Sequence, residues 1–193
     1  MTYYLVEWQG PFGFIKPWTA VRDGETFSQQ FLTPSIVEGM EKKLFPELLV
    51  EKGIRRIARH RLRYGQMDAQ QEVTQARGWN YKKNSAERPR SIITRQVMVN
   101  PTLFLAFRSL EDAERAATQH LCLCRNEDLV YPTGAIYTVK EEELEGDEEM
   151  WAGFELLFDS DAADAFLVGY NRYAEGAPMY GSLHAYGQPV YGF

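Results

Sequence analysis

The chain has 193 residues, which is enough for one domain or for one domain with a sizeable insertion. Its apolar content of 45% allows a core, and no apolar run is long enough to cross a membrane. The N-terminus MTYYLVEWQG lacks the pattern of a signal peptide, and Cys122 and Cys124 are too close for an ordinary disulfide, so a cytoplasmic protein is expected.

The net charge of −6 conceals a strong division along the chain. Residues 52–98 carry twelve Lys/Arg against three Asp/Glu, whereas residues 99–193 carry five against seventeen. This asymmetry indicates either a surface that binds a polyanion or a basic segment that folds onto an acidic one. Composition alone supports the two interpretations equally.

The stretch FLTPSIVEGMEKKLF, Phe31–Phe45, predicts the first helix. Pro34 suits the first turn, and Ser35 with Glu38 has the spacing of a capping box. Gly39 lies mid-helix, where glycine costs about 1 kcal/mol relative to alanine. We therefore expect something to approach Gly39 closely, either the sheet beneath the helix or a bound partner.

The segment GIRRIARHRLRY, Gly53–Tyr64, fits a helix or a long strand, and we favour the strand. Alternation along a strand places Ile54, Arg56, Ala58, His60 and Leu62 near one face. The opposite face then carries Ile57 and a nearly continuous basic row of Arg55, Arg59, Arg61 and Arg63.

The polar segment Gln66–Ser91 has little apolar periodicity and predicts an inserted arm, whose start, MDAQQEVTQA, fits a short helix. The other predicted elements are strands at Tyr3–Trp8, at Thr94–Phe107 with a bend at Asn100-Pro101, at HLCLC, at GAIYTV and at WAGFELLF, and helices at Ser109–Thr118 and DAADAFLVGYNRY. EEELEGDEE is expected to be an acidic, solvated loop.

The order strand, helix, strand, insertion, strand, helix, strand predicts an α+β protein with a ferredoxin-like, RNA-recognition-type βαββαβ domain. Residues 1–140 would form this domain, with the arm inserted at about residues 65–93. Residues 141–193 would add the acidic loop and a small C-terminal extension packed on the same domain. Sheets of this type are common platforms for single-stranded RNA.

Several segments together resemble the Cas five family, which supplies RAMP-type subunits of Cascade-like CRISPR effector complexes. The resemblance runs in order through VEWQGPFGFIKPW, FLTPSIVEGMEKKLF, TRQVMVNPTLFLAF and HLCLCRNEDLVYP, over roughly residues 4–135. Cys124 departs from the pattern, because it stands where the family has the glycine of a Leu-Gly-Arg segment.

The resemblance implies a non-catalytic subunit that grips the 5′ handle of the crRNA at one end of a hetero-oligomeric ribonucleoprotein, in antiviral or anti-plasmid defence. It also implies contacts with a CRISPR backbone subunit and with the large subunit, and a thumb-like arm that inserts between nucleotides. No cofactor, metal or membrane partner is expected.

The predicted RNA contacts are of three kinds. Arginine and lysine suit phosphate oxygens, aromatic rings stack on bases, and helix N-terminal amides bind anions. The basic candidates are Lys16, Arg55, Arg59, Arg61, Arg63, Arg77, Lys82, Lys83, Arg88, Arg90, Arg95 and Arg125. The aromatic candidates are Tyr64, Trp79 and Tyr81, and the helix N-terminus offers Ser35 and Ile36.

Three alternatives stand beside this interpretation. His120, Cys122 and Cys124 alternate on one strand face, where buried cysteines are favoured over a zinc site. Metal-independent cleavage of precursor crRNA is the enzymatic alternative, but Phe45 stands where cleaving relatives have a tyrosine. The third alternative is an unrelated ferredoxin-like protein, in which the basic and acidic segments pair with each other.

Overall fold

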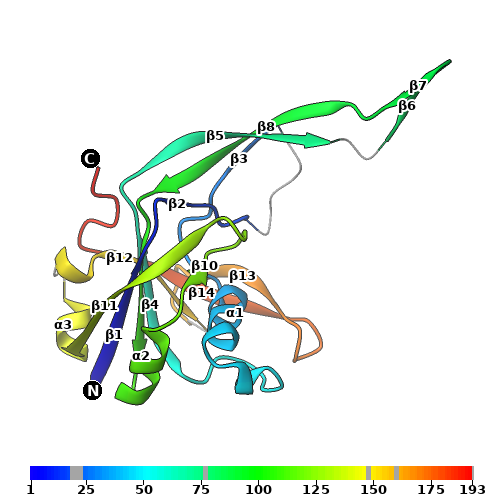
Figure 1. The fold of residues 1–193 in the computed structure, drawn as a ribbon. Coiled ribbons are helices and arrows are strands. Elements are labelled where there is room, and N and C mark those ends of the chain that lie inside the picture. The colour runs from blue at the N-terminus through cyan, green and yellow to red at the C-terminus, as the bar shows by residue number, and fades with distance from the viewer. Residues whose placement is uncertain (18–23, 76–77, 147–148, 159–160, 193) are drawn as a thin grey trace.

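A computed structural model describes residues 1–17, 24–75, 78–146, 149–158 and 161–192 (Figure 1). The protein is α+β, with mostly antiparallel strands and few helices. Its main sheet has eight strands, in the order β10 (Leu121–Cys122), β11 (Leu129–Lys140), β1 (Thr2–Gln9), β9 (Thr102–Phe107), β4 (Ile57–Arg63), β12 (Gly153–Phe158), β14 (Ala177–Tyr186) and β13 (Phe166–Asn171). Within these described ranges, no helix is long and apolar enough to cross a membrane.

The central strands of the sheet lie in the order β11-β1-β9-β4, and each neighbouring pair is antiparallel. The chain passes through α1 (Pro34–Leu44) and η1 (Pro46–Leu48) between β1 and β4, and through α2 (Leu110–Ala116) between β9 and β10. This arrangement is consistent with a ferredoxin-like type of fold, although further strands interrupt the predicted βαββαβ order. The predicted HLCLC strand is reduced to the two residues of β10, and β11 takes the place beside β1.

Both faces of the sheet are covered. On one face the larger core cluster joins Trp8 and Leu105 of the sheet to Met40 of α1 and Ala113 of α2. On the other face, Phe104 packs edge-on against Trp151 at 6.0 Å between ring centroids. Trp151 belongs to η2 (Glu149–Trp151), which follows α3 (Glu141–Glu145). The face that such sheets commonly offer to RNA is therefore covered here by the chain's own C-terminal half.

Strand β4 forms as predicted. A register shift between Ile57 and Arg59 changes the face of the sheet to which the side chains before the shift point. Ile57 and Leu62 both lie in the helix-side core cluster, although the predicted alternation placed them on opposite faces. Ala58 packs instead against the cluster on the other face. A β-bulge inserts one residue into the alternation, so the side chains before it switch faces. The predicted alternation of the basic row therefore holds only from Arg59 onward.

The predicted arm is a long hairpin that projects from the body (Figure 1). It consists of β5 (Gln66–Gln75) and β8 (Arg90–Val99), in antiparallel register from Gln66↔Val99 to Gln75↔Arg90. Beyond them, β6 (Asn80–Lys82) and β7 (Ser85–Glu87) form the tip. Near the body, β8 also pairs with β2 (Phe12–Gly13) and β3 (Glu25–Phe27).

Three local predictions are wrong. The MDAQQEVTQA segment is strand β5 and not a short helix, because its backbone pairs with β8. The segment predicted as a C-terminal helix contains strand β13, which pairs with β14. The acidic segment expected to be a solvated loop begins with α3, whose Leu144 is buried in the second core cluster.

The predicted bend at Asn100-Pro101 separates two sheets. Asn100 has a φ of 50°, in the left-handed region that asparagine tolerates. Strand β8 before it belongs to the arm and β9 after it to the main sheet. The C-terminal tail returns to this junction, where the Gly192 amide donates to the Gly65 carbonyl at 2.9 Å.

Helix α1 begins at Pro34 as predicted, but the capping prediction is wrong. Among the described residues, its N-cap Thr33 makes no side-chain cap hydrogen bond. Glu38 instead accepts a hydrogen bond from Lys42 at 2.6 Å. At Gly39, a Cβ would meet no described atom within 4 Å, so packing against the sheet does not explain the glycine.

Gly39→Ala is expected to raise the free energy of unfolding by about 1 kcal/mol, since alanine costs less in a helix and the added methyl group meets open space. Thermal unfolding followed by circular dichroism measures the change. Gly153→Ala is the control, because its Cβ would lie 2.9 Å from the Cβ of Arg61 and should destabilise the protein. A lower Tm for Gly39→Ala would contradict the expectation.

Candidate nucleic-acid interface

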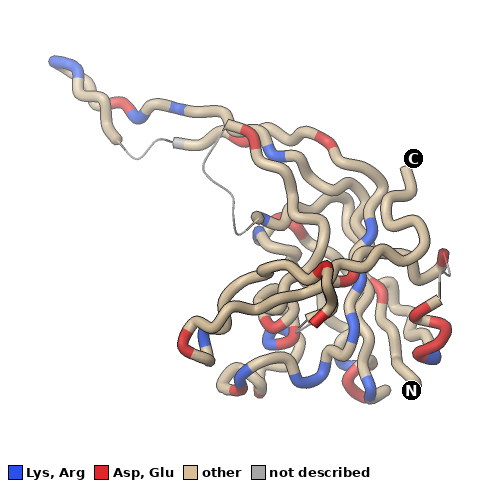
Figure 2. Tube along the Cα trace, turned by 180° about the vertical axis from the view of Figure 1, so that it is seen from behind, with Lys and Arg blue, Asp and Glu red and all other residues tan. Residues whose placement is uncertain are grey.

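The outer part of the arm combines positive charge with exposed aromatic rings. Residues 78–90 carry four Lys/Arg and one Asp/Glu, and Lys/Arg positions reach the end of the hairpin in Figure 2. Trp79 is 48% exposed and Tyr81 79%. The Arg88 guanidinium lies over the Trp79 ring, 4.8 Å from its centroid. Proteins that bind single-stranded nucleic acids commonly combine cations with exposed aromatic rings in this way.

The basic candidates at this end of the arm are solvent-exposed. Lys82, Lys83, Arg88 and Arg90 are all exposed, and Lys82 lies 3.8 Å from Glu87 in a pair that leaves both side chains more than two-thirds exposed. Such an exposed pair contributes little to stability, so Glu87 competes only weakly with a ligand for the Lys82 ammonium group. Arg77 lies outside the described residues.

The base of the arm holds two further candidates, and both are committed to internal ion pairs. Arg95 binds Glu72 at 2.7 Å, and Arg125 binds Asp128 at 2.6 Å. Their guanidinium groups lie over the buried Phe14 ring, at 5.0 and 5.3 Å from its centroid. The hydrogen bond to Asp128 raises the pKa of Arg125. Each ion pair lies within one part of the chain. The shared Phe14 ring and a 3.4 Å hydrogen bond from Arg125 Nη2 to Gln70 Oε1 join the arm to the body.

The predicted contacts at the start of α1 are only partly free. The Ile36 amide already donates to the Thr33 carbonyl at 3.0 Å, so it does not serve a phosphate. Ser35 is exposed, and so is Lys16, which follows β2.

The basic row on β4 pairs internally with the acidic C-terminal half. Arg59 Nε lies 2.5 Å from Glu155 Oε1, and Arg61 Nε lies 3.2 Å from Glu155 Oε2. Arg61 is 1% exposed and also donates to the carbonyls of Trp151, at 2.7 Å, and of Leu144. Burial pushes the pKa of Glu155 up, but the hydrogen bond and charge of Arg59 outweigh it and hold the pKa below its usual value.

The row therefore does not form the exposed basic surface that the alternation predicts. Arg63 lies over the Phe104 ring at 5.1 Å and donates to the Glu149 carbonyl at 3.2 Å. Arg55 is exposed and lies apart from these residues, before β4 begins. Arg59, Arg61 and Arg63 therefore fit the interpretation in which the basic segment folds onto other parts of the chain. The outer arm keeps its exposed positive charge.

Tyr64 is not available to stack on a base. It is 3% exposed, its ring packs in the helix-side core, and its hydroxyl donates to Gln30 Oε1 at 2.5 Å. Burial raises the pKa of its hydroxyl. Of the three predicted aromatic contacts, Trp79 and Tyr81 are exposed.

The described residues also bear on the zinc and nuclease alternatives. Within the described ranges, no group of three or more His, Cys, Asp or Glu side chains is arranged to hold a metal. Cys124 is exposed, which departs from the prediction of buried cysteines. Phe45 is fully buried, and the guanidinium groups of Arg56 and Arg115 lie 4.5 and 5.2 Å from its ring centroid.

His60 is a buried, uncharged side chain within this charged region. It is 5% exposed and stacks on Phe158 at 5.0 Å between ring centroids. Burial lowers its pKa to about 4, so the folded protein holds it neutral at physiological pH. An unfolded chain would protonate it near pH 6.5.

This difference predicts acid destabilisation. Between about pH 6.5 and 4 the unfolded state binds more protons, so the free energy of unfolding falls as pH falls, by about 2 kcal/mol at pH 5. Denaturant titrations across this range measure it. His60→Phe keeps an aromatic ring and should flatten the dependence, whereas His184→Phe, at an exposed position, should not. An equal slope in wild type and His60→Phe would refute the assignment.

No protein-family model matches this sequence, and no curated protein matches it. Among solved structures, a chain of one titled "CRISPR RNA-guided surveillance complex" superposes with a TM-score of 0.50. The superposition covers 95% of this chain and 90% of that chain, at 12% sequence identity. The two chains share a fold. The likeness extends over almost the whole chain, so it includes more than the central strands.

Proposed function

We propose that the protein is a non-catalytic crRNA-binding subunit of a Cascade-like CRISPR effector complex, of the Cas five type. In this role it grips the 5′ handle and caps one end of the assembly, in contact with a backbone subunit and the large subunit, in the cytoplasm. The outer arm carries the proposal, because it joins exposed cations to exposed aromatic rings. The fold shared with a chain from a CRISPR surveillance complex supports it.

In this proposal the two kinds of arm residue do different work. Lys82, Lys83 and Arg90 neutralise backbone phosphates, and Trp79 and Tyr81 stack on unpaired bases. Stacking contributes about 1–3 kcal/mol per base and tolerates any sequence. Sequence-specific recognition of the handle then depends on other contacts, for which exposed Ser35 and Lys16 are candidates.

RNA binding by the purified chain tests the proposal. Fluorescence anisotropy with a labelled single-stranded repeat RNA, over a range of salt concentrations, should show affinity that falls steeply with salt. Three phosphate contacts predict a slope of log K against log salt of about −2. Copurification of the chain with crRNA from cells that express the array and the other subunits tests the assembly. An affinity independent of salt, or a complex without crRNA, would overturn the proposal.

A further inference from the structure

The arm joins the body through two connections that lie side by side. Tyr64 and Gly65 link β4 to β5, and Asn100 and Pro101 link β8 to β9. The Gly65 amide donates to the Val99 carbonyl at 2.8 Å, so the two connections are hydrogen-bonded to each other. Hinges absorb changes of backbone angle at the ends of elements, so an arm that moved against the main sheet would pivot here.

Within the described ranges, other strands hold the arm along one edge. Strand β8 pairs with β2 and β3 near the body, whereas β5 pairs with β8 alone. On the β5 side, side chains make contact with the body, such as Met67 in the helix-side core and Gln70 with Arg125 at 3.4 Å. Backbone attachment on this side comes from the C-terminal tail.

The tail lies beside the turn from β4 to β5 and is hydrogen-bonded to it (Figure 1). The Tyr64 amide donates to the Pro189 carbonyl at 3.1 Å, and the Tyr191 amide donates to the Tyr64 carbonyl at 3.3 Å. The Gly192 amide donates to the Gly65 carbonyl at 2.9 Å. A parallel β-bridge joins the two segments, so the tail extends along the first connection like a short strand.

Tyr191 contacts both connections at once. Its amide binds the first connection, and its hydroxyl donates to the Asn100 carbonyl of the second at 2.7 Å. Its ring centroid lies 5.8 Å from the guanidinium of Arg63, the last residue of β4. The residue is 41% exposed, so burial in a core does not explain its position. Tyr191 therefore ties together the two strands that enter the arm.

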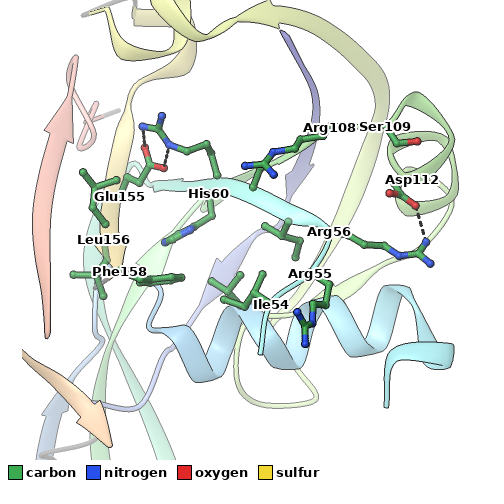
Figure 3. A pocket seen from close by; sticks show the side chains of 15 residues that line it. Ile54, Arg55, Arg56, His60, Arg108, Ser109, Asp112, Glu155, Leu156 and Phe158 are labelled. Atoms are coloured by element: carbon green, nitrogen blue, oxygen red, sulfur yellow. Dashed lines mark hydrogen bonds and ion pairs between the residues drawn. The ribbon is translucent and has the colours of Figure 1, made fainter. Parts of the chain in front are cut away.

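The other end of the tail is anchored on the body, beside the buried ion pairs. The guanidinium of Arg61 lies 3.6 Å from the ring centroid of Tyr186, the last residue of β14, whose hydroxyl accepts from Arg59 at 3.4 Å. Arg59 also binds Glu155 at 2.5 Å, and this pair borders the pocket drawn in Figure 3. Gly187 then turns the chain with a φ of 54°, in the left-handed region that favours glycine.

We propose that residues 187–192 form a strap that sets the angle of the arm to the main sheet, with Tyr191 as its positioning residue. The strap ties the β5 side and strands β2 and β3 tie the β8 side, so the arm is held along both edges. A two-stranded ribbon has little stability of its own, so without the strap the arm would sample a range of angles. A fixed angle lowers the entropy loss when the arm binds a ligand. The inference concerns the chain alone and does not depend on the proposed function.

Distances between spin labels test the strap on the full chain, without RNA. Ser91→Cys on β8 and Glu114→Cys on α2 place labels at exposed positions, with Cys122 and Cys124 replaced by serine. Pulsed electron paramagnetic resonance should give a narrow distance distribution, and Tyr191→Ala should widen it at least twofold. Tyr191→Phe, which loses only the hydroxyl, should widen it less. Tyr191→Pro, which also loses the amide donor, should widen it more.

Two controls separate the strap from general destabilisation. Tyr180→Ala removes another half-exposed tyrosine, on β14, which makes no hydrogen bond to the arm's connections among those described, and it should leave the distribution unchanged. A label pair within the body, Glu51→Cys with Glu114→Cys, should stay narrow in Tyr191→Ala. Should Tyr191→Ala widen the body pair as well, Tyr191→Phe takes its place and the same comparison applies.

Two results would overturn the inference. One is the same arm distribution in the wild type and in Tyr191→Pro, because the arm would then keep its angle without the strap. The other is equal widening in Tyr180→Ala and Tyr191→Ala, because the effect would then not belong to the tail. Neither measurement uses RNA, so a failure of the arm to bind RNA would contradict the proposed function and leave the strap assignment intact.

Discussion

Glu155→Gln is expected to destabilise the protein by about 3–5 kcal/mol, because it leaves Arg61 buried without its counter-charge. Glu155 is 1% exposed, and glutamine has nearly its shape, so the loss reports charge and hydrogen bonding and not a cavity. Arg61 holds the C-terminal half against the sheet through the Trp151 and Leu144 carbonyls. Equilibrium denaturation in urea, monitored by tryptophan fluorescence, measures the loss.

Glu145→Gln is the matched control for this prediction. Glu145 makes the same kind of contact, with Arg59 at 3.4 Å, but its side chain is 58% exposed. Solvent screens such a pair, so the same substitution there should change stability by less than about 1 kcal/mol. In the Glu155→Gln background, Arg61→Met should restore part of the loss, since it removes the uncompensated charge. Equal losses at the two glutamates would show that Arg61 does not depend on Glu155.

The ion pairs of Arg59 and Arg61 with Glu155 also determine which variants can report on RNA binding. Arg59→Glu with Arg61→Glu would be the natural test of a basic row read from the sequence. In the folded protein this change places two carboxylates beside buried Glu155 and breaks the attachment of η2 to the sheet. Lost RNA binding in that variant would reflect lost folding. Only exposed cations, such as Lys82 and Lys83, separate the two effects.

Local sequence patterns predicted the elements whose side chains meet the core. Helices α1 and α2 carry apolar residues at the helical period, whereas β1 and β9 carry short, nearly continuous apolar runs, which are typical of strands that are buried on both faces. Strand β5 lacks this signal because none of its described side chains is fully buried, and most of its residues are polar. The partners of Arg61 lie 83 to 94 positions away in the chain. No local sequence period encodes such a pairing. In the sequence it was indicated only by the division between the basic segment 52–98 and the acidic segment 99–193.

The arm residues became candidates for a different reason. Clustered cations with interleaved aromatic residues stand out in a segment that lacks apolar periodicity. Trp79 and Tyr81 lie within three residues of Lys82, so local spacing alone brings ring and charge together on one hairpin. Tyr64 has the same local neighbourhood of arginines but is buried, because the tail pairs with the backbone around it.

Lys82→Glu with Lys83→Glu is expected to weaken binding of single-stranded RNA by at least tenfold at physiological salt. Each phosphate contact contributes about 0.7 to the salt slope, so losing two should make the slope shallower by about 1.4. Lys52→Glu with Lys140→Glu is the control, since it changes the net charge equally at exposed positions on the body. A similar loss in the control would attribute binding to overall charge and not to the arm.

Trp79→Ala with Tyr81→Ala separates stacking from charge on the same hairpin. Both rings are exposed, so their removal should leave the Tm unchanged while costing about 1–3 kcal/mol per stacked base. Stacking releases no counterions, so this variant should lose affinity by the same factor at every salt concentration and keep the slope of the wild type. Parallel lines for the aromatic variant and converging lines for the lysine variant would show that both parts of the arm contact the RNA. If the aromatic variant binds as tightly as the wild type, the arm acts as a charged surface alone and does not insert between bases.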